Sequence, residues 1–276
     1  MQAEGVAVVS GANRGIGRSV ALELAARGFE VVAGARDPAA AGDLAEAAKQ
    51  TGGRLRVARL DVTRPETFAP PDGLRVLVNN AGIEPEYLPV EHTPLEVWRR
   101  VFETNLFGLV ELTRRAIPRL RAAGGGVLCN ITTSSLLAPV PLYAAYRASK
   151  AAVSALGETL TAELDAFGIR LLEVLPGPID TDMFTRSGRL PEGARHPGYR
   201  EVAERVHAGR MGSEASVTPP EAAARAIVDA VLDDEAPLRL ACDPLAEGLL
   251  ASWRGQSDEA FRRGMLPAFV GPGSDA

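Results

Sequence analysis

Cysteine is scarce in this sequence, which has only Cys129 and Cys242 among its 276 residues. Two cysteines are too few for a disulfide framework, and they lack the paired spacing that a zinc site requires. We therefore expect no bound metal, and a reduced, cytoplasmic setting fits this composition.

Excess positive charge and long apolar runs are also missing. The 30 Lys and Arg residues are outnumbered by 35 Asp and Glu residues, which gives a net charge of −5. Such a chain offers no basic surface to a phosphate backbone or an anionic membrane. Met1 is followed directly by the apolar stretch 6–9 without a basic leader, and no apolar run reaches membrane-spanning length. We expect neither nucleic acid nor a membrane as a partner.

What is present is typical of a folded α/β protein. Hydrophobic residues make up 46% and charged residues 24% of the chain, far from the composition of a disordered segment. Two small domains would fit this length, but α/β folds of this size commonly form one unit. We expect a single domain over residues 1–276.

Short apolar runs alternate with amphipathic stretches that are typical of helices. The predicted strands lie near residues 6–9, 31–33, 55–59, 76–79, 127–131 and 171–175. Parallel strands need crossovers long enough to hold a helix. The alternation therefore predicts a doubly wound parallel sheet of the Rossmann-like α/β class. Only the third crossover helix should be short or missing, because residues 63–75 contain Pro65, Pro70 and Pro71.

Three further segments are marked by their residues. Residues 93–96 and 218–221 both match a capping box with proline in the first turn, which predicts helix starts at these places. Residues 182–212 are rich in Arg, Gly and Pro and lack a clear period, so we expect a long loop or lid with some helix of its own.

A glycine-rich turn, Gly11–Gly17, joins the first predicted strand to the first predicted helix. Glycines permit a tight turn, and they let backbone amides and the positive end of the helix approach a pyrophosphate. A glycine turn without a ligand is the alternative interpretation. The spacing is Gly-x-x-x-Gly-x-Gly, and it resembles the first turn of the short-chain dehydrogenase/reductase family.

Further motifs extend this resemblance along most of the chain. They are Asp61-Val62, Asn79-Asn80-Ala81-Gly82, Asn105, Tyr146-Arg147-Ala148-Ser149-Lys150 and Pro176-Gly177-Pro178-Ile179-Asp180-Thr181. The resemblance implies that Asp61 contacts the adenine, that the 79–82 segment supports sheet and cofactor, and that Thr181 binds the nicotinamide carboxamide. The cofactor-binding residues that it implies are Gly11, Asn13, Arg14, Gly15, Ile16, Gly17, Arg36, Asp61, Val62, Asn80, Ala81, Gly82, Tyr146, Lys150, Pro176, Gly177, Ile179 and Thr181. The tail after Asp243 has no counterpart among these motifs.

The end of the second strand indicates which phosphate state of the cofactor is bound. NAD enzymes place a carboxylate there, but this chain has Ala35 followed by Arg36. A guanidinium would make a charge-assisted contact with a 2′-phosphate, so NADP(H) is favoured over NAD(H). Asp37 is an objection, which we answer by placing it in a turn before Pro38. Arg14 adds little weight, because the family has arginine there with either cofactor.

Tyr146 and Lys150 are four residues apart in a stretch of helical composition, so both side chains project from one face. An adjacent ammonium favours the ionised form of a tyrosine, whose unperturbed pKa is about 10. A core tyrosine beside a surface lysine is the alternative. Against it, only Lys49 and Lys150 of the 30 cationic residues are lysines, so a lysine at this place is unusual. The resemblance makes Tyr146 the catalytic acid or base, and Lys150 its partner and a ligand of the nicotinamide ribose.

Two more catalytic positions follow from the resemblance. Asn105 matches an asparagine that holds a water behind the lysine. The family has a serine thirteen residues before the tyrosine, which hydrogen-bonds the substrate oxygen, and that position here is Thr133. A threonine offers the same hydroxyl. We assign the role to Thr133, with the neighbouring Ser134 as the alternative.

These residues predict an NADP(H)-dependent oxidoreductase that interconverts a ketone or aldehyde and an alcohol. A non-catalytic NADP(H)-binding regulator and a lyase or epimerase are the alternatives, because one fold hosts several functions. A small, largely apolar substrate is expected, since the predicted walls are Leu136, Leu137, Val140, Leu142 and Tyr143. By analogy with the family we expect a homodimer or homotetramer.

Overall fold

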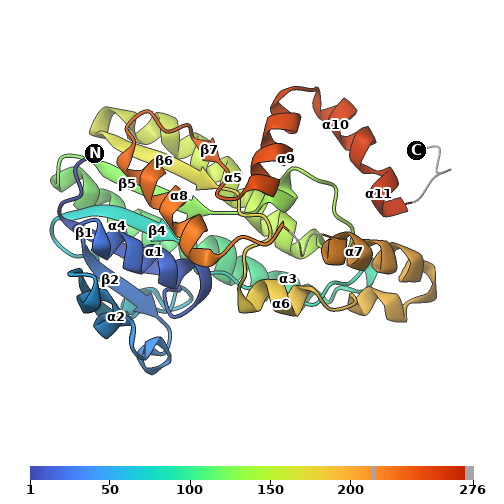
Figure 1. The fold of residues 1–276 in the computed structure, drawn as a ribbon, viewed down its shortest axis with the longest axis horizontal. Helices are drawn as coiled ribbons and strands as arrows, with labels where there is room; N and C mark the ends of the chain where they lie inside the picture. The colour runs from blue at the N-terminus through green and yellow to red at the C-terminus, as the bar shows by residue number, and fades with distance from the viewer. Residues whose placement is uncertain (213–215, 271–276) are drawn as a thin grey trace.

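Seven parallel strands form one sheet in the computed structural model, which describes residues 1–212 and 216–270 (Figure 1). Their order across the sheet is β3-β2-β1-β4-β5-β6-β7. The strands are β1 (Val6–Ser10), β2 (Glu30–Ala35), β3 (Arg54–Arg59), β4 (Leu74–Asn79), β5 (Gly126–Ile131), β6 (Ile169–Val174) and β7 (Arg239–Leu240). The doubly wound, Rossmann-like fold predicted from the sequence is confirmed.

Alternating side chains of the strands build two cores, one on each face of the sheet. In β1, Ala7 and Val9 belong to the core that includes Val20 and Ile227, whereas Val8 belongs to the opposite core with Leu112. Successive strand residues point to opposite faces, and both faces of a parallel sheet are covered by helices. This is why inner strands such as β1, β2 and β5 read as nearly unbroken apolar runs, whereas the edge strand β3 alternates between polar and apolar residues.

Helices cover both faces of the sheet and extend beyond its carboxyl edge. The helices are α1 (Gly15–Ala26), α2 (Leu44–Gln50), α3 (Leu95–Phe102), α4 (Gly108–Ala122), α5 (Ala144–Leu164), α6 (Asp182–Ser187), α7 (Arg200–Gly212), α8 (Pro220–Leu232), α9 (Pro244–Arg254), α10 (Asp258–Met265) and α11 (Pro267–Val270). α1 packs against α8 on one face, while α4 and α5 cover the other. As predicted, the third crossover has no α-helix, only the 3₁₀ turn Pro65–Thr67. No helix among the residues described here is long and apolar enough to cross a membrane.

The two predicted helix starts are correct in place but wrong in mechanism. α3 begins at Leu95 and α8 at Pro220, and neither receives a side-chain cap. Pro94 and Pro219 take the cap position in extended conformation, so each threonine is displaced one residue outward. The Thr93 hydroxyl donates instead to the carbonyl of Pro89 at 2.8 Å, and the backbone of Thr218 pairs with that of Ile179.

The segment 182–212 contains more helix than its composition suggested. It consists of α6 and α7 with the 3₁₀ turns Glu192–Arg195 and Pro197–Tyr199 between them. The chain beyond β7 forms an arch of α9, α10 and α11, and α11 returns to lie against α7 (Figure 1). The last residues of the expected 1–276 domain, 271–276, lie outside the described residues.

Candidate active site

The candidate site lies at the carboxyl ends of the strands, where the strand order reverses between β1 and β4. Open α/β sheets bind ligands at this switch point. A cavity of about 710 Å³ begins at the glycine-rich turn after β1 and reaches α7 and α11. One continuous space of this size and length can hold a dinucleotide together with a small substrate.

Backbone contacts explain why the turn after β1 needs glycine. Gly11 has a φ of 66°, a conformation that favours glycine. A Cβ on Gly17 would lie 2.3 Å from the Asn80 side-chain nitrogen and 2.5 Å from the Gly11 carbonyl. That nitrogen donates to the carbonyls of Ser10 (3.0 Å) and Gly11 (3.1 Å). The glycines thus let the loop after β4 pack directly onto the phosphate-type turn.

Ser10 is a residue of this site that the sequence motifs did not reveal. It is buried at the end of β1, and its hydroxyl oxygen accepts hydrogen bonds from the backbone N–H groups of Asn80 and Ala81. The hydroxyl itself faces the carbonyl of Val78 at 3.3 Å. Ser10 therefore fixes the two loops to each other at the switch point.

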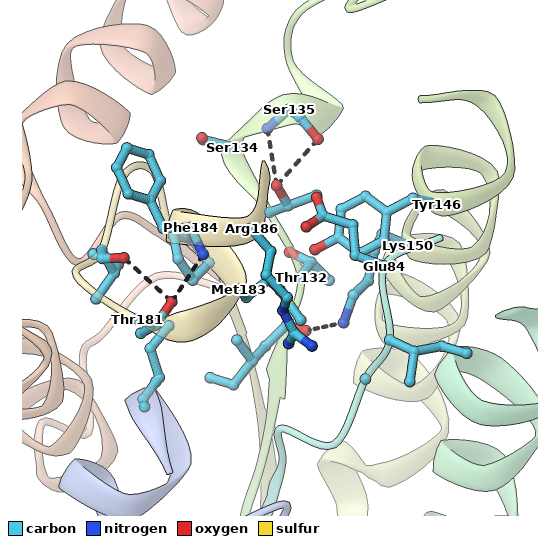
Figure 2. A pocket seen from close by; sticks show the side chains of 18 of the residues that line it. Glu84, Thr132, Ser134, Ser135, Tyr146, Lys150, Thr181, Met183, Phe184 and Arg186 are labelled. Atoms are coloured by element: carbon cyan, nitrogen blue, oxygen red, sulfur yellow. Dashed lines mark hydrogen bonds between the residues drawn. The ribbon is translucent and has the colours of Figure 1, made fainter. Parts of the chain in front are cut away.

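The cavity brings together all but one of the residues that were predicted to bind a cofactor. The residues that line it are Gly11, Asn13, Arg14, Gly15, Ile16, Arg36, Asp61, Val62, Asn80, Ala81, Gly82, Tyr146, Lys150, Pro176, Gly177, Ile179 and Thr181. Gly17 lies behind the turn and contacts Asn80. Thr181 also begins α6, because its hydroxyl oxygen accepts a hydrogen bond from the Phe184 N–H at 3.3 Å (Figure 2).

Arg36 follows β2 directly and lies exposed at the rim of the cavity. Asp37 stands in a turn, as predicted, since its carboxylate accepts a hydrogen bond from the Ala39 N–H at 3.0 Å. Arg14 is paired with Asp182 at 3.3 Å. Arg36, unlike Arg14, forms no ion pair with any of the described residues.

Tyr146 and Lys150 project from α5 into the same end of the cavity, as their spacing predicted (Figure 2). Both are buried, with 7% and 4% of their surfaces exposed. The Lys150 ammonium donates to the carbonyl of Ile131 at 2.7 Å, and burial lowers the pKa of Lys150 to about 8. Lys150 is therefore not the surface lysine of the alternative interpretation.

The expected lowering of the tyrosine pKa does not occur in this structure. Burial raises the pKa of Tyr146, and the Glu84 carboxylate raises it further, whereas the Thr133 hydroxyl lowers it by hydrogen bonding. Desolvation disfavours the phenolate because the charged form loses its water. The Tyr146 hydroxyl is consequently protonated at neutral pH.

Asn105 lies in a π-helical turn, Glu103–Phe107, between α3 and α4 rather than in a regular helix. Its side-chain nitrogen donates to the Ile83 carbonyl (2.9 Å) and to the Ser149 hydroxyl (3.0 Å), and its oxygen accepts from the Ile83 N–H (2.8 Å). Asn105 is fully buried and does not line the cavity. It connects the loop after β4 with the helix that carries Tyr146 and Lys150.

Thr133 and Ser134 both line the cavity, but their hydroxyls differ in direction. The Thr133 hydroxyl lies within hydrogen-bonding range of Tyr146, and it also contacts Ser135, 3.1 Å away. Ser134 points away from Tyr146 (Figure 2). β5 ends at Ile131, so a turn, not strand alternation, sets these directions.

Glu84 was missed by the sequence analysis, although it follows the Asn-Asn-Ala-Gly segment by two residues. Its carboxylate lines the cavity near Tyr146, with 12% of the side chain exposed. Within 1–212 and 216–270, no group of three or more His, Cys, Asp or Glu side chains is arranged to hold a metal ion. Glu84 is therefore not one member of such a cluster.

The chain after Asp243 also contributes to the cavity, which no motif indicated. Its apolar residues there are Leu245, Leu249, Met265, Ala268 and Phe269, and Phe269 packs against the cluster of Tyr87, Tyr143, Tyr146 and Val206.

Of the residues predicted to form the walls of the substrate pocket, Val140 and Tyr143 do line the cavity. Leu136 and Leu137 were placed wrongly, because they line a second cavity with Trp253 and Phe261, and Leu142 packs on Gly193.

Asp243 joins the C-terminal arch to the loop after β6. It is buried, and its carboxylate accepts hydrogen bonds from the N–H groups of Gly177 (2.6 Å) and Ala246 (3.0 Å). The second bond caps α9. A Cβ on Gly177 would lie 2.5 Å from this carboxylate, so glycine permits the approach.

We expect Asp243→Ala to lower the free energy of unfolding by roughly 2 to 4 kcal/mol, because it removes a helix cap and leaves a buried N–H without an acceptor. Urea unfolding at pH 7 measures the loss. Ser257→Ala is the matched control, since Ser257 caps only the exposed start of α10 and should cost about 1 kcal/mol or less. Equal losses in the two variants would contradict this account of Asp243.

Comparison with known proteins identifies a family with this kind of site. The family model described as short chain dehydrogenase matches residues 5–190. The chain is 36% identical over 198 residues to a short-chain type dehydrogenase/reductase of Picea abies, covering 65% of this chain and 72% of that protein.

Solved structures of similar proteins superpose on nearly the whole chain. A short-chain dehydrogenase from Streptomyces avermitilis has a TM-score of 0.76 and 32% identity, covering 91% of this chain and 93% of its own. A short chain dehydrogenase from Burkholderia cenocepacia J2315 in complex with NADP has a TM-score of 0.73 and 27% identity, covering 96% and 99%. The chain therefore belongs to the short-chain dehydrogenase/reductase family of oxidoreductases, which use a nicotinamide cofactor on alcohol or carbonyl groups of small molecules.

Proposed function

We propose that this protein is an NADP(H)-dependent oxidoreductase that interconverts a ketone or aldehyde and the corresponding alcohol, with Tyr146 as the general acid and base. The observation that carries the proposal is the placement of Tyr146, Lys150 and Thr133 at one end of a cavity whose other end is the glycine-rich turn. Proton-transfer groups and a dinucleotide site thus share one space.

The residues of the cavity fit a nicotinamide dinucleotide. The glycine-rich turn leaves room for backbone amides to approach a pyrophosphate, and α1 directs its positive end there. Asp61 would face the adenine half, and Lys150 and Thr181 the nicotinamide half. Bound there, the cofactor would supply or accept the hydride at the carbinol carbon.

Tyr146, Thr133 and Lys150 divide the proton chemistry among them. In reduction, the protonated Tyr146 hydroxyl gives its proton to the substrate oxygen as the carbonyl carbon becomes tetrahedral. The Thr133 hydroxyl donates a hydrogen bond to the same oxygen and stabilises the developing negative charge. The Lys150 ammonium stabilises the tyrosinate that remains. Asn105 positions this group through Ser149 and Ile83.

The cofactor preference rests on Arg36. Its guanidinium lies at the rim of the cavity directly after β2, where a carboxylate would accept the ribose hydroxyls of NAD. Asp37 does not replace that carboxylate, since it caps the turn that follows. The NADP complex of the Burkholderia cenocepacia relative supports the same choice.

We expect Arg36→Ala to weaken NADPH binding by roughly 1.5 to 3 kcal/mol while NADH binding barely changes, because only NADPH has the 2′-phosphate that the guanidinium contacts. Fluorescence titration of the two cofactors measures both affinities. Arg54→Ala, at an exposed position at the opposite end of the sheet, is the control. Equal weakening of both cofactors would show that Arg36 does not bind the phosphate.

The substrate is proposed to be a small, largely apolar carbonyl compound or alcohol. Val140, Phe184 and Val206 line the substrate end of the cavity together with the apolar residues of the C-terminal arch. Segment 182–212, which supplies α6 and α7 to this wall, is proposed to act as the substrate lid.

A panel of ketones and aldehydes, followed by the absorbance of NADPH, tests the proposal. Consumption of NADPH with an apolar carbonyl compound is the expected result. If no compound is reduced and no alcohol is oxidised, the non-catalytic regulator or the lyase or epimerase becomes the better assignment.

Two properties of the whole molecule complete the proposal. A homodimer or homotetramer is proposed by analogy with the family, and light scattering measures it. Cys129 and Cys242 are both buried and unbridged, and burial raises the pKa of Cys129 to about 12. Such unreactive thiols agree with a reduced, cytoplasmic setting.

A further inference from the structure

Glu84 is a half-buried carboxylate that the proposed proton chemistry does not use. The backbone just before it is fixed, because Asn105 hydrogen-bonds both the N–H and the carbonyl of Ile83. The side chain lines the cavity beside Tyr146 and Lys150, opposite Thr181 and Phe184 (Figure 2). A ligand bound at Tyr146 therefore lies close to this carboxylate.

The surroundings of Glu84 are cationic. Burial raises the pKa of its carboxyl group, while Tyr87, Arg210, Arg186 and Lys150 each lower it. The Arg210 guanidinium lies 3.9 Å from the carboxylate, too far for a hydrogen bond. Three positive charges near one carboxylate disfavour a cationic ligand, so an uncharged hydrogen-bond donor is the better match for the carboxylate oxygens.

Two tyrosines form the wall beside Glu84. Tyr87 and Tyr143 stack with ring centroids 4.0 Å apart, and only 8% and 3% of their surfaces are exposed. The Tyr87 hydroxyl lies within hydrogen-bonding range of Glu84, and the Tyr143 hydroxyl lies within that range of Tyr87 and Arg210. Both hydroxyl oxygens are shielded from solvent, so the two tyrosines form a wall behind the carboxylate. The Glu84 side chain, in contrast, is 12% exposed and lines the cavity, so it is the acceptor of this group that a ligand can reach.

We propose that Glu84 forms a subsite for a second hydroxyl group of the substrate, distinct from the oxygen that Tyr146 protonates. A hydroxyl group is a hydrogen-bond donor, and a carboxylate is an acceptor. The second hydroxyl donates to the Glu84 carboxylate, which lines the cavity beside Tyr146. The substrate class is then an otherwise apolar diol or hydroxy ketone. This inference rests on the proposed function, since it specifies the substrate of the same site.

Matched alcohols test the subsite. The 1,2-, 1,3- and 1,4-cyclohexanediols are compared with cyclohexanol as substrates for oxidation with NADP⁺. We expect kcat/KM for the best diol to exceed that for cyclohexanol by roughly 10- to 100-fold, the size of one hydrogen bond to a charged group. In Glu84→Ala this ratio should fall to about one. Glu84→Gln keeps one acceptor oxygen, so its ratio should lie between that of the wild type and that of Glu84→Ala.

Glu86→Ala is the matched control. Glu86 is two residues away, is 62% exposed, lies outside the cavity and pairs with Arg100, so the ratio should not change. A wild-type ratio near one, or a ratio that survives in Glu84→Ala, would overturn the subsite. A general effect of Glu84 on Tyr146 would lower both substrates equally and leave the ratio intact.

Failure of the proposed function gives a different result. If wild-type protein oxidises neither probe, calorimetric titration with the diols measures binding directly. Binding that Glu84→Ala abolishes would uphold the subsite and reject the reaction. Absence of binding would reject the subsite.

Discussion

Tyr146→Phe is expected to lower turnover by roughly 10² to 10⁴ while NADPH affinity stays nearly unchanged. The substitution removes only the hydroxyl that we propose as the proton donor, and it keeps the ring that packs with Tyr87, Tyr143 and Val206. Because this ring is buried, the fold should be retained. The loss should therefore be in kcat rather than in cofactor binding.

Steady-state kinetics with a carbonyl substrate from the panel, alongside a cofactor titration, provides the measurement. Tyr199→Phe is the matched control, because that hydroxyl bonds Glu91 outside the cavity at 2.8 Å. Near-normal turnover in folded Tyr146→Phe would reject the mechanism, whatever the substrate.

Thr133→Val is expected to lower turnover by about 10² to 10³. Valine has nearly the shape of threonine but no hydroxyl, so the developing oxyanion would lose a donor. The Thr133 hydroxyl lies within hydrogen-bonding range of Tyr146. The Ser134 hydroxyl points away from Tyr146 (Figure 2). Ser134→Ala should therefore have a mild effect.

Single-turnover rates separate these two hydroxyls, since they report the chemical step without product release. Thr133→Ser, which restores the hydroxyl in a smaller side chain, should recover most of the rate that Thr133→Val loses. A collapse in Ser134→Ala with survival of Thr133→Val would reverse the assignment and leave the roles of Tyr146 and Lys150 unchanged.

The fold could be predicted from the sequence because its short apolar runs mark the positions of the buried strands. Strands buried on both faces are unbroken apolar runs, and the prolines at 65, 70 and 71 left no room for a third crossover helix. The helix caps could not be predicted in detail. A Thr-Pro pair can place either residue at the cap, and Pro94 and Pro219 take that position here.

In the site, contiguous motifs pointed to residues that line the cavity in the structure, whereas residues that approach it from elsewhere in the chain were not found. The turn after β1, Arg36 and the Tyr146–Lys150 pair were located by local pattern. The effect of Lys150 on the pKa of Tyr146 was misjudged, because the ammonium is bonded to Ile131 and burial dominates. Glu84 and Asp243 act through burial and through distant partners, which spacing along the chain does not encode.

The two halves of the cavity come from different parts of the chain. The family match ends at residue 190, whereas Val206, Leu249, Met265 and Phe269, on the substrate side, all lie beyond it. Substitutions in that late segment are expected to change the shape of the proposed substrate end without touching the groups proposed to move the proton. Asp243 hydrogen-bonds the N–H of Gly177, within the matched residues, and so joins the two parts of the chain. We therefore expect that exchange of the terminal segment changes the substrate preference, provided that this hydrogen bond is kept.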